Sequence, residues 1–146
     1  MAYHERKGSM KYLFLDFDGV LHPTTHGSTL FSKAHLLEDA LIKYECSIII
    51  SSSWRFHLSL EEITLTLPEG IRHLIQGVTG EPYMGQYARY HEIVGYLYDH
   101  DKHFANWRAL DDSWAEFPEG CDNLITCNPN TGITKVEIEK LIDWLR

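Results

Sequence analysis

Short apolar runs alternate with stretches of helical periodicity along the chain, a pattern typical of βαβ units on a mostly parallel sheet. Runs rich in β-branched and aromatic residues predict five strands, at residues 11–17, 46–50, 75–80, 107–112 and 123–127. Apolar side chains that recur every three or four residues predict helices between them, and Ser59 with Glu62 and Thr134 with Glu137 form capping boxes. The other expected helix starts are Ser32, Pro68 and Gln86. The pattern therefore predicts an α/β fold.

Length and composition fit one domain. A chain of 146 residues with 44% hydrophobic residues can bury about two thirds of its unfolded surface, so we expect a single domain over residues 11–146. The polar residues 1–10 are expected to be a flexible tail or a cloning remnant. No apolar run approaches the roughly 20 residues of a membrane helix. We therefore expect a soluble protein without membrane partners. Cys46, Cys121 and Cys127 lack metal-ligand spacing, which favours reduced thiols and hence a cytoplasmic protein.

The net charge of −8 argues against broad, sequence-independent binding of nucleic acid, which needs many Lys and Arg contacts to phosphates. A few focused contacts with one end of a nucleic acid remain compatible with it.

Carboxylates gather where predicted strands end. Asp16 and Asp18 flank Phe17 at the end of the first strand, and Asp111 and Asp112 end the fourth. Ligands of open α/β sheets bind beyond the carboxyl ends of the strands, so the four carboxylates are expected to share a site. Side chains two apart on an extended segment point the same way, so both early aspartates should face the site while Phe17 enters the core. An oxygen-rich site of like charges needs a cation, and Mg²⁺ is the simplest candidate.

Four segments resemble, in order, the motifs of the haloacid dehalogenase (HAD) superfamily of phosphohydrolases. "DFDGVLH" matches its DxDG(V/T)L motif, and "IIISSSWR", "RYHEIVGYL" and "ALDD" resemble its second, third and fourth motifs, spanning residues 12–112. The resemblance implies a Rossmann-like, three-layer α/β/α fold and a Mg²⁺-dependent phosphatase with an aspartyl-phosphate intermediate. The "SSSWR" form and the small size are similar to the branch found as phosphatase domains in RNA-repair proteins.

The resemblance also implies a role for each acidic residue. Asp16 would be the nucleophile, and Asp18 the general acid and base, with its backbone carbonyl on the metal. Asp111 or Asp112 would complete the metal shell, so the expected ligands are Asp16, Asp18, Asp111 and Asp112. Gly19 would let the backbone approach the ligand closely.

The phosphate contacts are less sharply specified. Ser52 is the first choice to hold a phosphate oxygen and Ser51 the second, because the register of the serine run is not fixed by sequence. Arg89 would stabilise the transferring phosphoryl group, with Arg72 and Lys102 as alternatives because the family more often has Lys there. Arg55 would either reach the substrate phosphate or form a surface salt bridge.

The gaps between motifs leave no room for a large cap domain. An open site suits a phosphate on a bulky substrate, such as a nucleic-acid end or a phosphoprotein. Trp54 and Trp114 are expected to wall a pocket or pack the core more than to stack a base. Two other functions stay open: a non-catalytic module that binds phosphorylated ligands, and a receiver-type phosphoacceptor domain.

Overall fold

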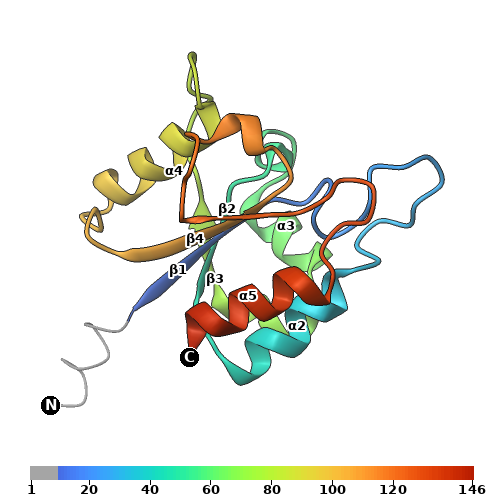
Figure 1. Ribbon diagram of the computed structural model, residues 1–146. Helices are drawn as coiled ribbons and strands as arrows, with labels where there is room; N and C mark the ends of the chain where they lie inside the picture. The colour runs from blue at the N-terminus through green and yellow to red at the C-terminus, as the bar shows by residue number, and fades with distance from the viewer. Residues whose placement is uncertain (1–9) are drawn as a thin grey trace, which may run out of the picture.

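A computed structural model describes residues 10–146, so the predicted tail lies outside the described residues except for Met10. Within this range the chain forms one five-stranded sheet with the order β3-β2-β1-β4-β5, in which every pairing is parallel (Figure 1). The strands are β1 (Lys11–Leu15), β2 (Ser47–Ile50), β3 (Ile75–Val78), β4 (Asn106–Asp111) and β5 (Leu124–Thr126). The predicted five strands and α/β class are confirmed.

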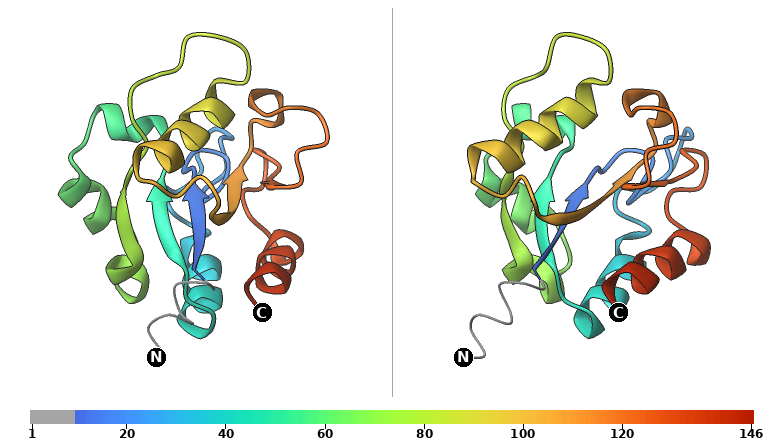
Figure 2. Two further views of the ribbon diagram at one scale, coloured as in Figure 1. Left: turned by 90° about the vertical axis from the view of Figure 1, so that its left-hand side faces the viewer. Right: turned by 60° about the vertical axis from the view of Figure 1, so that its left-hand side comes forward.

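Helices cover both faces of the sheet (Figure 2). On one face lie α2 (Ala34–Lys43), α3 (Leu60–Thr66) and α5 (Lys135–Leu145), and on the other lies α4 (Ala88–Asp99). Leu13 and Leu15 of β1 pack with the first group, whereas Phe14 between them packs with α4, as the alternation of side chains along a strand requires. This is the predicted three-layer, Rossmann-like α/β/α fold.

The order of the strands creates a switch point beside β1. From β1 the chain adds β2 and β3 on one side, and then crosses to place β4 on the other. Leu15 is in register with both Ile50 and Leu110, so the residues that follow these three positions emerge side by side. The N–H of Asp16 donates to the Leu110 carbonyl at 3.1 Å, and the N–H of Ser51 donates to the Leu15 carbonyl at 3.0 Å. A site at this edge agrees with the general rule for open α/β sheets.

The predicted helix starts and caps are partly confirmed. Both predicted capping boxes are present, at the starts of α3 and α5. Ser32 was the wrong N-cap for α2, because the helix begins after Lys33 and no side chain caps it. The helix expected from Pro68 is a 3-10 helix, η2 (Glu69–Leu74).

The described segments between strands carry only short helices, and no separate cap domain stands over the sheet. No helix within residues 10–146 has the length and apolarity to cross a membrane.

Candidate active site

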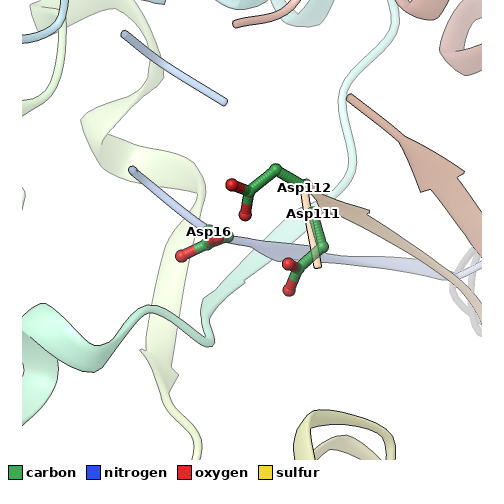
Figure 3. Close-up of side chains that lie close together, drawn as sticks. All are labelled: Asp16, Asp111 and Asp112. Carbon is green, nitrogen blue, oxygen red and sulfur yellow. The ribbon is translucent and has the colours of Figure 1, made fainter. Parts of the chain in front are cut away.

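Three carboxylates meet at the switch point, where β1 and β4 end (Figure 3). Asp16 follows β1, Asp111 ends β4, and Asp112 is the next residue; each offers an oxygen, and all these oxygens lie within 4.8 Å of one another. Asp16 is only 5% exposed and Asp111 is fully buried. Carboxylate oxygens at this spacing are the ligands that a hard divalent cation such as Mg²⁺ prefers.

Burial disfavours the charged forms of the Asp16 and Asp111 carboxyl groups. It raises the pKa of Asp16 well above the usual value, the Asp111 charge adds to this, and Arg89 acts in the opposite direction. Burial also raises the pKa of Asp111 to about 6, again against the effect of Arg89. The cluster therefore holds more negative charge than its surroundings compensate, which fits a bound divalent cation.

Arg89, in the first turn of α4, is the cation at this site. Its Nη1 donates to the Asp111 carboxylate and lies 3.5 Å from Asp16 Oδ1. Burial alone would lower the pKa of Arg89, but Asp111 and Asp16 raise it, so the guanidinium stays charged. The two alternatives lie elsewhere: Arg72 donates to carbonyls of its own segment, and Lys102 sits over the Tyr12 ring.

Asp18 does not join the three carboxylates. Its side chain is 52% exposed; Oδ1 lies 2.8 Å from His22 Nε2, and Oδ2 accepts a hydrogen bond from Trp54 Nε1 at 3.0 Å. β1 ends at Leu15, before both aspartates, and the side-chain oxygens of Asp18 are not part of the cluster formed by Asp16, Asp111 and Asp112. That Asp16 and Asp18 face a common substrate stays a prediction. The contribution of the Asp18 backbone carbonyl to a metal shell stays a prediction.

The sequence interpretation missed both partners of Asp18. No spacing rule points to His22, although it lies within the first motif, and Trp54 approaches from the segment after β2. Phe17 is fully buried, as predicted.

Gly19 allows the turn beside the cluster, at φ +79°. A Cβ at this position would overlap the Asp112 carboxylate. We expect Gly19→Ala to displace Asp112, to weaken Mg²⁺ binding by roughly tenfold, and to cost about 1–3 kcal/mol of stability through the left-handed backbone. Titration calorimetry with Mg²⁺ and urea unfolding measure the two effects.

Gly27→Ala is the matched control, because Gly27 has φ +84° but no atom within 4 Å of the added Cβ. It should lose stability and keep its Mg²⁺ affinity. Equal Mg²⁺ affinity in wild type and both variants would contradict the proximity of Gly19 to a working metal ligand.

The serine run places two hydroxyls differently. Ser52 Oγ accepts a hydrogen bond from the Trp54 N–H at 3.2 Å and caps the 3-10 helix η1 (Ser53–Phe56). Ser51 and Asp16 each follow one of the paired residues Ile50 and Leu15. Ser51 Oγ is buried, and among residues 10–146 it is the one buried side-chain polar atom without a hydrogen-bond partner. An unpaired buried hydroxyl is costly unless a ligand satisfies it.

Arg55 lies inside the protein. Its guanidinium donates to the carbonyls of Ser51, Ser52 and Gly80 and to Glu92 Oε1, at 2.9–3.1 Å. The Arg55 and Glu92 side chains are only 3% and 8% exposed, so the expected surface salt bridge is a buried one. Through it the Arg55 side chain ties the serine segment to α4, and a contact of Arg55 with a substrate phosphate stays a prediction.

A model of the family described as "HAD domain in Swiss Army Knife RNA repair proteins" matches residues 12–138, which include all the site residues above. The chain belongs to this family. It is thereby placed among HAD-type phosphohydrolases and related modules. No curated protein and no solved structure matched the chain.

In this HAD domain a hollow of about 670 Å³ is lined by the segment between β4 and β5, by β5 itself and by Tyr87, directly before α4. Trp114, which is 72% exposed, Tyr87 and Phe117 are among its lining residues. Trp54 packs against the hydrophobic core. Trp114 thus lines a pocket and Trp54 packs on the core while its indole N–H reaches Asp18. Whether either ring stacks a base stays a prediction.

Proton and metal should compete for the carboxylates of the HAD domain. Because the folded-state pKa values of Asp16 and Asp111 are raised, their contribution to stability without metal is present at low pH and is lost as the pH rises through those raised values, which for Asp111 is about 6. Mg²⁺ needs the deprotonated groups. We expect Mg²⁺ to raise the Tm more at about pH 7.5 than at about pH 5, as measured by thermal unfolding at constant ionic strength. An equal Tm shift at both pH values would contradict this prediction.

Proposed function

We propose that this HAD domain is a Mg²⁺-dependent phosphomonoester hydrolase that works through an aspartyl-phosphate on Asp16. The observation that carries the proposal is the buried Asp16 carboxylate at the switch point, with Asp111, Asp112 and Arg89 around it. Membership of the HAD family supports the same reaction class.

The residues suit two successive displacements. In the first, an Asp16 oxygen attacks phosphorus, the bond from phosphorus to the leaving oxygen breaks, and that oxygen takes a proton from Asp18. In the second, water attacks phosphorus and gives a proton to Asp18, while the bond from phosphorus to Asp16 breaks and releases inorganic phosphate. Arg89 places positive charge beside the transferring group. Mg²⁺, held by Asp16, Asp111 and Asp112, would supply the charge that lets an anionic carboxylate approach an anionic phosphate.

Ser51 is the better candidate for the phosphate oxygen, which reverses the order of preference from the sequence. We expect Ser51→Ala to lower kcat/KM by roughly tenfold or more without loss of stability, because its hydroxyl has no partner in the protein. Ser52→Ala is the matched variant. It removes a helix cap, so it should cost about 1 kcal/mol of stability, and it should keep more of the wild-type kcat/KM than Ser51→Ala does. Measurement of kcat/KM and urea unfolding of both variants distinguishes the two serines. A larger loss of kcat/KM in Ser52→Ala than in Ser51→Ala would make Ser52 the better candidate again.

The substrate is proposed to carry its phosphate on a bulky group, with a nucleic-acid end as the first candidate and a phosphoprotein as the second. Within residues 10–146 no cap domain stands over the carboxyl ends of the strands, and Tyr87, two residues before Arg89, lines the hollow beside β5. The name of the family, which refers to RNA repair, supports the nucleic-acid end. Only local contacts are required, so the net charge of −8 is compatible with it.

Phosphate release by the purified protein tests the proposal. The substrates are p-nitrophenyl phosphate, a mononucleotide, and oligonucleotides phosphorylated at the 3′ or 5′ end, each with Mg²⁺ or with EDTA. Metal-dependent release is the expected result, and preference for one oligonucleotide end would assign the substrate class. Binding of phosphorylated oligonucleotide without any release, by folded protein with Mg²⁺ bound, would favour a non-catalytic module.

A further inference from the structure

The carboxylate of Asp18 is held by two N–H groups from different segments. His22 Nε2, in the turn after β1, lies 2.8 Å from Oδ1, and Trp54 Nε1, in η1 after β2, donates to Oδ2 at 3.0 Å. Each oxygen thus has its own donor, and the orientation of the carboxylate is defined.

The hydrogen bond made by Nδ1 of His22 defines which nitrogen of the neutral ring carries the proton. Nδ1 lies 3.1 Å from the backbone N of Phe31 and accepts its N–H, so the neutral ring carries its proton on Nε2 and donates it to Asp18. The ring is 3% exposed and meets Phe31 edge-on, with a centroid distance of 5.3 Å. Rotation of the buried imidazole would break both hydrogen bonds, so the donor is rigid.

Aromatic packing holds the second donor in the same way. The Trp54 ring packs edge-on against Phe17 and Phe31, with centroid distances of 5.5 and 5.3 Å. Phe17 is fully buried in the core, so the indole N–H is fixed to the sheet through it.

We propose that His22 and Trp54 are positioning residues that keep the Asp18 carboxyl group turned away from the carboxylate cluster and toward the open face where the leaving group meets it. This proposal rests on the proposed function. Asp18 is 52% exposed although its two donors are anchored in packed segments, which suits a group that must meet both substrate and water. Without the donors, the carboxylate would be free to turn toward a cation bound by Asp16, Asp111 and Asp112, where it could not protonate a leaving group.

The dependence on the leaving group separates positioning from general structural damage. Trp54→Phe keeps an aromatic ring and removes the N–H, and His22→Leu removes the other donor. Phenyl phosphate needs a proton on its leaving oxygen, whereas p-nitrophenyl phosphate needs it much less. The comparison uses kcat/KM, which reports the first displacement and not the hydrolysis step shared by both substrates. A positioned general acid contributes roughly 10²–10⁴-fold, so each variant should lose about tenfold in kcat/KM on phenyl phosphate and less than about threefold on p-nitrophenyl phosphate.

Combination with Asp18→Asn gives the control. Added to that variant, Trp54→Phe and His22→Leu should cause no further loss on phenyl phosphate, because the group they hold is already inactive. His22→Gln keeps an N–H near the position of Nε2 and should recover part of the loss of His22→Leu. In the NMR spectrum, the indole N–H signal of Trp54 should shift and exchange faster in Asp18→Ala.

Equal losses on both substrates, additive losses in the Asp18→Asn background, or an unmoved Trp54 signal would overturn the positioning role. Each of these results leaves the proposed function intact, provided that wild type releases phosphate and Asp16→Asn does not. Absence of hydrolysis by wild type would overturn both proposals.

Discussion

Asp16→Asn is expected to lower metal-dependent phosphate release by roughly 10³-fold or more, because the amide cannot form the bond to phosphorus. Asn has nearly the same shape as Asp, and Asp16 lies buried directly after β1 with its backbone N–H bonded to β4, so the fold should remain. The measurement is phosphate release under saturating Mg²⁺ with the substrate that wild type prefers.

The same substitution should not lower stability. Burial and the charge of Asp111 raise the pKa of Asp16, so its charged form weakens the metal-free protein near pH 7. Removal of that charge should leave the free energy of unfolding unchanged or raise it by about 1 kcal/mol, as measured in urea with EDTA. Asp143→Asn is the control: its side chain is 74% exposed, and its loss should alter neither activity nor stability by a comparable amount. Retained activity would contradict the role of Asp16 as the nucleophile, and an unfolded Asp16→Asn protein would contradict the expected stability.

Arg89→Met is expected to affect both stability and catalysis. It leaves Asp16 and Asp111 buried without their cation, and removal of one partner from a buried ion pair costs about 3–5 kcal/mol. It also removes the positive charge beside the transferring phosphoryl group, which should lower kcat by roughly 10²–10³-fold. Mg²⁺ should restore much of the stability, since it neutralises the same carboxylates, but not the activity.

Two variants make this result specific. Arg89→Lys keeps the charge without the guanidinium geometry, and should fall between wild type and Arg89→Met. Arg146→Met removes an exposed arginine that pairs with Asp143, and should change stability by less than about 1 kcal/mol. Urea unfolding with and without Mg²⁺, together with kcat, gives the comparison. Unchanged metal-free stability in Arg89→Met would contradict the ion pairs assigned to Arg89.

The sheet was predictable because its signal is local. Strands buried on both faces need continuous apolar runs. The run "YLFL" identifies β1 directly, and the run "SIII" identifies β2. Convergence of Asp16 with Asp111 followed from the parallel order alone, because the carboxyl ends of such strands share one edge. The capping box of Thr134 was readable because both partners lie within four residues.

The remaining features depend on backbone geometry and on distant segments. The Asp18 carboxylate contacts His22 and Trp54 and not the cluster, and no residue type in the motif points to these partners. The choice between Ser51 and Ser52 depends on a single step in the register of β1 against β2. The burial of Arg55 could not be predicted because its ion-pair partner, Glu92 of α4, lies 37 residues further along the chain.

The most direct test of the central claim is a rapid acid quench of wild type during turnover with Mg²⁺, followed by mass spectrometry of its peptides. We expect a phosphoryl group on the peptide that contains Asp16, formed and lost at rates consistent with kcat, and absent from Asp16→Asn. Turnover without any phosphoryl group on Asp16 in the quenched protein, combined with phosphate release by Asp16→Asn at the wild-type rate, would contradict the assignment of Asp16 as the nucleophile.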